Sequence, residues 1–249
     1  MKQGLPRRHG LARTLSKQGL CSRTEAARWV QQGRVAVDGR VVRDPEFPII
    51  PGRHRIKVDD RPLGQAERIY LMLNKPRGLV TTAKDEQGRD TVYRCFDAAE
   101  GLPWLAPVGR LDKASEGLLL FSNDPAWASR ITTPSGELDK TYHVQVDRIP
   151  DELLIEKLLQ GSVLEGEHLR AKSVGLLRSG EKNAWLEIVL DEGRNRHIRR
   201  LLAEFDIGVL RLVRVAIGSL VLGDLPKGQW RKLDVREAAS LAPPADLIP

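Results

Sequence analysis

The segment VAVDGRVV, residues 35–42, constrains the fold more than any other short stretch of this chain. Its apolar residues alternate with other types on both sides of Asp38 and Gly39. An Asp-Gly pair flanked by such alternation is the strongest short-range signal for a β-hairpin. Just upstream, Ser22 stands three residues before a glutamate, which is the pattern of a helix capping box. The sequence therefore predicts a helix over 23–31 that leads into a hairpin.

The first quarter of the chain also carries all of its net positive charge. Residues 1–60 hold 13 Lys and Arg against 6 Asp and Glu, and the whole chain has a net charge of +7. Apolar residues at helical spacing predict a further helix over 9–18. Arg23 and Arg28 lie on the second helix and Arg34 lies just after it. Arginines in these positions favour contacts with nucleic-acid phosphates. A basic surface that only maintains solubility is the alternative interpretation.

The rest of the chain is richer in strands than in helices. A polar segment that contains proline and glycine predicts a linker over 61–68, between a module at 1–60 and a body at 69–240, with an irregular tail at 241–249. Strands are expected at 55–58, 69–73, 118–122, 140–146, 184–190, 210–215 and 219–222, and helices at 126–131, 151–160 and 195–205. Because strands and helices do not alternate regularly, an α+β fold with a mixed, largely antiparallel sheet is favoured over a doubly wound one.

Simple patterns exclude several classes of protein. The longest apolar runs are strand-sized, which excludes a membrane span. The charged start MKQGLPRRHG is not followed by the apolar stretch of a secretory signal. The two cysteines, Cys21 and Cys95, belong to no paired CxxC motif, so neither a disulfide framework nor a zinc site is expected. These features indicate a cytoplasmic protein.

The segment VGRLDKASEGLLLFSND, residues 108–124, places a carboxylate in a loop-like stretch of a basic protein. Asp112 follows Arg110 and precedes a strand-like apolar run. A carboxylate can act as a covalent nucleophile, and it needs a cationic neighbour to remain ionised in a partly dry pocket. Because alternate residues of an extended stretch point to opposite faces, that cation is expected from elsewhere in the chain. On residue chemistry alone, a turn-forming role for Asp112 is the more common one.

Tyr142 lies in KTYHVQV, a strand whose alternate residues face the same side. A tyrosine that faces a pocket can stack on a base and handle a proton, although a place in the core is the more common role. His143 is expected on the opposite face. A further alternative, an unrelated α+β hydrolase that uses Asp112 and His143, is disfavoured because the sequence has neither a second positioned carboxylate nor a nucleophile elbow.

The segment EGRNRHIRRLLAEF, residues 192–205, combines an apolar stripe at helical spacing with a cluster of arginines. The arginines are Arg194, Arg196, Arg199 and Arg200. Positive charges in a first helical turn oppose the helix dipole, so this placement favours nearby phosphates or a carboxylate. A solvated arginine face is the alternative interpretation.

These motifs together resemble a known family. LSKQGLCSRTEAARWVQQGRVAVDGRVV resembles the S-four-like RNA-binding domain, a module first described in a protein of the small ribosomal subunit. NKPRG, GRLD, SEGLLLFSND, LDKTYHVQV and EGRNRHIRRLL follow in that order, and the set is similar to the bacterial ribosomal-RNA pseudouridine synthases. The resemblance spans nearly the whole chain. It implies a mixed sheet with a cleft, in which one uridine of the bound RNA is flipped out.

The resemblance also implies roles for individual residues. Asp112 matches the catalytic aspartate, Tyr142 the aromatic residue that stacks on the flipped base, and Arg199 the arginine that pairs with the aspartate. RNA contacts are expected from Arg23, Arg28, Arg34, Arg110, Arg194, Arg196 and Arg200. The implied reaction converts a uridine of ribosomal RNA, or of a ribosomal assembly intermediate, to pseudouridine. It is an isomerisation, so no cofactor and no metal are expected, and the family resemblance suggests a monomer.

Two points remain open in the sequence. The residues of SEGLLLFSND resemble enzymes that act on large-subunit RNA somewhat more than those that act on small-subunit RNA. His197 stands where many relatives have glutamine, which leaves the local hydrogen bonding undecided. The main alternative function is a non-catalytic RNA-binding or ribosome-assembly factor. Asp112 discriminates between the two functions, because a carboxylate beside RNA repels phosphate and has no use in a pure binder.

Overall fold

The chain divides into two compact units, and each has its own hydrophobic core. The computed structural model describes residues 8–50, 52–64, 66–98, 101–133 and 138–242. The first unit comprises the described residues of the ranges Met1–Ile69, Glu100–Ala106 and Ser122–Pro125. The second is drawn from Tyr70–Ala99, Pro107–Phe121 and Ala126–Pro249. No helix in the described ranges is long and apolar enough to cross a membrane.

The first unit combines two helices with short strands, as the hairpin signal predicts. Its elements are β1 (His9–Gly10), α1 (Leu11–Lys17), α2 (Arg23–Gln31), β2 (Val35–Val37), β3 (Arg40–Val41), β4 (Pro48–Ile49), β5 (Ile56–Val58) and β6 (Arg61–Pro62). Four strands form a sheet in the order β3-β2-β5-β6, and β1 pairs with β4. The hairpin turns at Asp38 and Gly39, whose φ angles of 50° and 82° suit the tight turn that matches strand twist.

Helix α2 begins where the capping pattern predicts. The Ser22 hydroxyl accepts a hydrogen bond from the backbone N–H of Glu25 at 3.1 Å, which satisfies one of the unpaired N–H groups of the first turn. The segment expected to be an irregular linker, 61–68, is partly ordered into the sheet. Its first two residues form β6 and pair with β5.

The second unit is built on a nine-stranded sheet, which confirms the α+β fold. Its strands are β7 (Tyr70–Lys75), β8 (Ala106–Val108), β9 (Glu116–Ser122), β10 (Lys140–Val146), β11 (Ser162–Leu164), β12 (Glu167–Leu169), β13 (Ser173–Ser179), β14 (Ala184–Leu190), β15 (Val209–Ile217), β16 (Leu220–Val221) and β17 (Trp230–Lys232). Its helices are η1 (Val92–Phe96), α3 (Pro125–Thr132), α4 (Glu152–Gln160), α5 (His197–Ala203) and α6 (Val235–Leu241).

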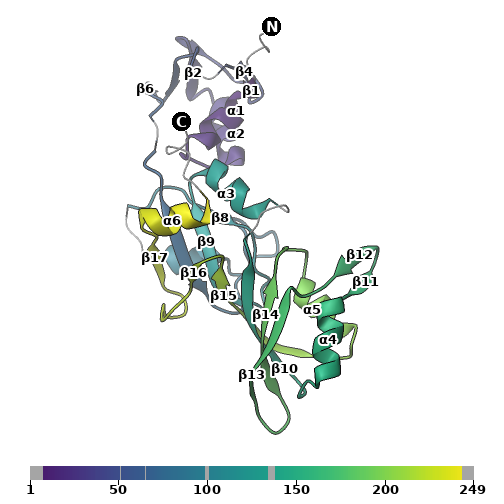
Figure 1. The fold of residues 1–249 in the computed structure, drawn as a ribbon. Coiled ribbons are helices and arrows are strands. Elements are labelled where there is room, and N and C mark those ends of the chain that lie inside the picture. The colour runs from purple at the N-terminus through teal and green to yellow at the C-terminus, as the bar shows by residue number, and fades with distance from the viewer. Residues whose placement is uncertain (1–7, 51, 65, 99–100, 134–137, 243–249) are drawn as a thin grey trace. The chain divides into compact units, whose positions relative to one another are not determined.

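The order of strands in the large sheet brings distant parts of the sequence together. The order is β13-β14-β10-β15-β9-β7-β17, with β16 paired to β15 and β8 to β9, whereas β11 and β12 form a separate hairpin (Figure 1). Strand β10 pairs antiparallel with β14 and β15. Strands β15 and β9 are parallel. The loop before β9 and the strand β10 therefore lie on either side of β15.

The sequence predicts the long half-buried strands and misses the long exposed strand β13. Strands β10 and β14 match their predicted ranges, because each buries every second residue. No strand is predicted for β13, which lies at the sheet edge and exposes most of its residues without alternation. Helix α5 begins at His197 rather than at the predicted residue 195, because Arg196 adopts a left-handed conformation with φ of 48°.

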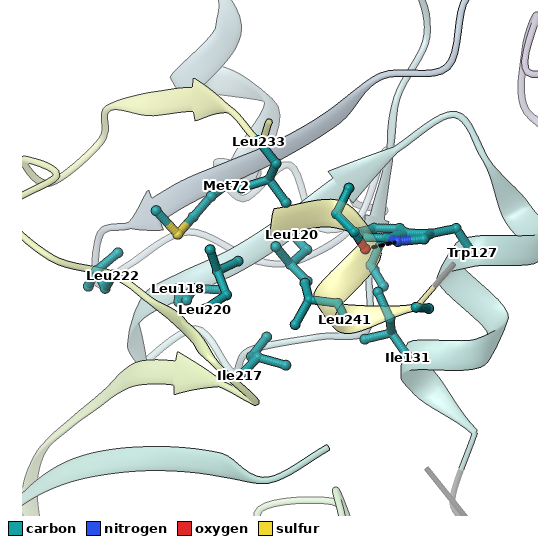
Figure 2. Close-up of a cluster of buried hydrophobic side chains, with 13 residues drawn as sticks. Met72, Leu118, Leu120, Trp127, Ile131, Ile217, Leu220, Leu222, Leu233 and Leu241 are labelled. Carbon is teal, nitrogen blue, oxygen red and sulfur yellow. Dashed lines mark hydrogen bonds between the residues drawn. The ribbon is translucent and has the colours of Figure 1, made fainter. Parts of the chain in front are cut away.

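The core of the second unit fixes strand β9. Figure 2 shows Leu118 and Leu120 of β9 gathered with Met72, Trp127 and Leu241, which come from β7, α3 and α6. Trp127 is completely buried, and its indole N–H donates to the carbonyl oxygen of Ala238 at 2.9 Å. Burial of large apolar side chains is the main stabilising term in such a core. The strand that follows the Asp112 loop is therefore rigidly held.

Candidate active site

Asp112 lies in the loop between β8 and β9, and a buried lysine fixes the backbone of that loop. Lys75, at the end of β7, is completely buried. Its ammonium group donates to the carbonyl oxygens of Asp112 at 3.2 Å, Ser115 at 2.9 Å and Pro76 at 3.1 Å. Such charge-assisted hydrogen bonds are roughly twice as strong as neutral ones. The backbone of Asp112 is therefore held in place while its side chain remains 34% exposed.

Lys75 and Thr81 are positions whose roles the sequence does not reveal. Burial lowers the pKa of Lys75 from 10.5 to about 8. The Thr81 hydroxyl donates to the carbonyl oxygen of Leu111 at 2.7 Å, which fixes the residue before Asp112. The available signal was the lysine of NKPRG at the end of an apolar strand, because lysine is almost never fully buried unless it has partners.

Two arginines of the segment 192–205 approach Asp112. Arg196 immediately precedes α5, and its Nη1 atom lies 3.9 Å from Asp112 Oδ2. Arg199, in the first turn of α5, donates to the carbonyl oxygens of Ala114 at 3.3 Å and Val209 at 3.2 Å. Burial and the charge of Arg196 lower the pKa of Arg199, and the charge of Asp112 acts in the opposite direction.

This geometry differs from the expected ion pair between Arg199 and Asp112. Among the described residues, the ion pair to Asp112 comes from Arg196, because the Arg199 guanidinium is anchored to backbone carbonyl groups. Arg199 still places a positive charge close enough to interact with the carboxylate. Both arginines therefore place positive charge near the Asp112 carboxylate.

Tyr142 belongs to the buried face of β10, as the alternating pattern predicts. Its side chain is 8% exposed, and its partner across the neighbouring strand β15 is Arg214. His143 faces the other side of the sheet and lies 3.5 Å from Glu187. The hydrolase alternative is wrong, because His143 does not join Asp112.

A cavity of about 680 Å³ brings the main predicted residues together. Its lining includes Asp112, Tyr142, Arg199, Arg110, Arg194 and Arg196. Pockets of roughly 300–1,000 Å³ hold small ligands, so this one has room for a single nucleotide. A carboxylate, an aromatic ring and several cations on one lining suit an anionic ligand that carries a planar base.

Arg194 and Arg200, which were expected to contact RNA, form ion pairs within the protein. Arg200 lies 2.6 Å from Glu167 and 3.1 Å from Glu165, so it ties the β11–β12 hairpin to α5. Arg194 lies 2.8 Å from a carboxylate oxygen of Glu192. Of the two, only Arg194 also lines the cavity.

His197 opens α5 and is almost completely buried. Its Nε2 atom lies 3.0 Å from the carbonyl oxygen of Arg170, and its Nδ1 atom lies 3.7 Å from Glu192. Burial lowers the pKa of His197, which favours the neutral ring. The side chain therefore fixes the start of α5 through the protein backbone.

The three arginines predicted to bind RNA in the first unit lie at its surface. Arg23 pairs with Glu46 at 3.1 Å, Arg28 with Glu25 at 2.9 Å and Arg34 with Asp59 at 2.5 Å. Exposed ion pairs of this kind contribute about 0–1 kcal/mol. Each arginine can therefore exchange its carboxylate for a phosphate at little cost.

Comparison with known proteins assigns both parts of the chain. A family described as RNA pseudouridylate synthase matches residues 69–204, and a family described as the S4 domain matches residues 10–53. The chain belongs to the RNA pseudouridine synthases. It is therefore an enzyme that catalyses an intramolecular isomerisation, and its S4 domain binds RNA.

Relatives from distant bacteria align with nearly the whole chain. A ribosomal large subunit pseudouridine synthase B from Escherichia coli O6:H1 is 35% identical over 246 residues, covering 96% of this chain and 84% of the relative. The protein of the same name from Bacillus subtilis is 34% identical and covers 95% of this chain and 96% of its own length. A crystal structure of a pseudouridylate synthase is 30% identical, covers 94% of this chain and all of its own, and superposes with a TM-score of 0.64.

Proposed function

We propose that this RNA pseudouridine synthase isomerises a specific uridine of ribosomal RNA, that the RNA belongs to the large subunit, and that Asp112 is the catalytic carboxylate. The observation that carries the assignment of residues is the shared cavity. Asp112, Tyr142 and Arg199 come from a loop, a strand and a helix that are far apart in sequence, and all three line that cavity.

Each of the three residues has a role that its surroundings support. Asp112 lies beside the positive charges of Arg196 and Arg199, and it is exposed enough to reach a ligand. Tyr142 offers a mostly buried ring on which a flipped base can stack. Arg199 holds the backbone of the catalytic loop at Ala114 and adds positive charge.

Arg110 and Arg196 are the best-placed RNA contacts in the catalytic unit. Both line the cavity and are exposed, and in the part of the chain that the structure describes neither donates to a backbone carbonyl group. Arg110 follows β8 and adjoins the catalytic loop, so it can bind the phosphate next to the flipped nucleotide. Residues 1–60 supply a separate basic anchor, which strengthens binding without selecting the sequence.

The names of two relatives support the choice of RNA. Both are called ribosomal large subunit pseudouridine synthases, and they are 34–35% identical to this chain. A genetic test addresses the target directly. Pseudouridines are mapped in ribosomal RNA from cells with and without the gene, and loss of a site in small-subunit RNA alone would contradict the proposal.

Release of tritium tests the reaction. Pseudouridine is joined to ribose through C5, so the hydrogen on C5 of the target uridine is lost when the product forms. The protein is incubated with large-subunit RNA that is unmodified and tritiated at C5 of uridine. We expect one equivalent of tritium per target site, and no release from any unmodified ribosomal RNA would refute the proposal.

A further inference from the structure

Two cations in the cavity are left unused by the roles proposed above. Lys140 on β10 and Arg214 on β15 both line the same cavity as Asp112 and Tyr142. Strand register pairs Arg214 directly with Tyr142. Residues paired in this way on antiparallel strands project from the same face of the sheet, with Cβ atoms about 5 Å apart. Arg214 is therefore the immediate neighbour of the ring proposed to carry the base.

Arg214 is held rigidly and lacks a partner for one of its nitrogens. It is 7% exposed, and its Nε atom donates to the carbonyl oxygen of Leu118 at 2.8 Å. Its Nη2 atom is buried without a hydrogen-bond partner among the described residues. A buried cationic donor without a partner is unfavourable, so such a group points to a ligand that supplies an acceptor.

Lys140 adds a second charge to the same place. The neighbouring carboxylate of Asp139 is taken up by Lys172, at 2.7 and 2.9 Å. Within the described residues Lys140 forms no ion pair of its own. Burial and the charge of Arg214 lower the pKa of Lys140, which reflects the concentration of positive charge there. An electron-rich ligand in the cavity would therefore stabilise both cations.

We propose that Lys140 and Arg214 form an oxyanion site that binds a carbonyl oxygen of the flipped uracil and stabilises the negative charge that develops on the ring. This inference rests on the proposed function, which puts the base against Tyr142. When the bond between ribose C1′ and N1 breaks, its electron pair stays on the uracil and spreads over N1, O2 and O4. Donors fixed beside those oxygens lower the barrier without having to reorganise.

The remaining steps balance without a further reactant. The ring turns, a π electron pair of the anionic ring forms the bond between C5 and C1′, the proton on C5 leaves to a base, and N1 takes up a proton. Lys140 and Arg214 form no covalent bond in any of these steps. They favour the uracil over a phosphodiester as ligand because Arg214 is 93% buried beside the tyrosine, whereas a phosphate is better served by the exposed Arg110.

The test separates chemistry from binding. Arg214→Met, Arg214→Lys and Lys140→Met are compared with Lys157→Met, which removes a positive charge from an exposed position on α4 outside the cavity lining. Tritium release from C5-labelled large-subunit RNA is followed with enzyme in excess, and the Kd for the same RNA is measured by filter binding. Circular dichroism melts establish that each variant is folded.

We expect Arg214→Met to lower the single-turnover rate by about 10²-fold, the usual effect of removing one oxyanion donor, with Kd within about twofold of the parent. Lys140→Met should act in the same direction, Arg214→Lys should recover part of the rate, and Lys157→Met should leave it unchanged. A normal rate with weakened binding would assign the cations to phosphate and overturn the proposal, as would no effect of Lys140→Met. If Arg214→Met does not fold, Lys140→Met decides. Absence of tritium release from the parent enzyme would instead refute the proposed function.

Discussion

Gly117 offers the sharpest test of how the fold holds the site together. It is the second residue of β9, and parallel pairing sets it opposite Arg214 on β15. A Cβ atom at this position would lie 2.2 Å from the carbonyl oxygen and 2.8 Å from the backbone nitrogen of Arg214. The φ angle of Gly117 is +100°, which L-residues rarely adopt. Replacing Gly117 with alanine therefore forces the two strands apart or changes the backbone.

The size of the effect follows from these two terms. A left-handed conformation costs an L-residue about 1–2 kcal/mol, and overpacking adds about 1–3 kcal/mol. Gly117→Ala should therefore lower the free energy of unfolding by about 2–5 kcal/mol. Activity should fall as well, because the same strand pairing sets the Asp112 loop against Arg214.

Urea unfolding followed by tryptophan fluorescence measures the change. The matched control is Gly175→Ala on β13, where an added Cβ meets no heavy atom within 4 Å and φ is not positive. A substitution in open space should change stability by no more than about 0.5 kcal/mol. The reasoning is refuted if Gly117→Ala unfolds at the same urea concentration as Gly175→Ala.

Three further predictions test other parts of the structure. The folded pKa of Lys75, about 8, lies below its unfolded value near 10.5, so the unfolded chain binds more protons between these values and stability should rise with pH there. The free energy of unfolding of the parent minus that of Lys75→Met should grow by roughly 3 kcal/mol between pH 7.5 and pH 10.5. A difference that does not change with pH would contradict the burial argument. Arg200→Met should speed hydrogen exchange in residues 162–169, which Arg200 ties to α5, but change RNA affinity less than twofold; a large loss of affinity would instead make Arg200 an RNA-binding residue. Replacing Arg23, Arg28 and Arg34 together with glutamine should weaken RNA binding and reduce the slope of log K against log salt by about 0.7 for each phosphate that the variant no longer neutralises, and an unchanged slope would remove the first unit from the interface.

Local periodicity predicted much of the fold because the periodic elements are half buried. The hairpin at Asp38 and Gly39 and the strands β10 and β14 follow from turn chemistry and alternation alone. Strand β13 was missed because an exposed edge strand has no apolar face to record in its sequence. The small hairpin of β11 and β12 was missed because its strands have only three residues each, which is too short to show an alternating pattern.

The candidate site was predicted as a set of residues but not as a set of contacts. The family resemblance selected Asp112, Tyr142 and Arg199, and all three line one cavity. Among the described residues, the ion pair to Asp112 comes from Arg196 instead, because the Arg199 guanidinium donates to the backbone carbonyl groups of Ala114 and Val209. A one-dimensional pattern carries no information on such hydrogen bonds between distant segments.

Buried polar residues were the hardest to predict. Lys75 and Arg214 are buried charged residues in largely apolar strands, where a charge departs from the pattern. Hydrogen bonds show that Lys75 fixes the Asp112 loop, and the sheet register shows that Arg214 lies beside Tyr142.

The role of Asp112 is the central claim, and one measurement tests it most directly. Asp112→Asn and the parent enzyme are compared for tritium release from C5-labelled ribosomal RNA and for their Kd toward the same RNA. The substitution keeps the shape of the side chain, and the backbone contacts from Lys75 are unaffected because they involve the carbonyl oxygen. We predict a loss of activity of about 10³-fold or more with RNA binding retained. An Asp112→Asn variant as active as the parent would contradict the account.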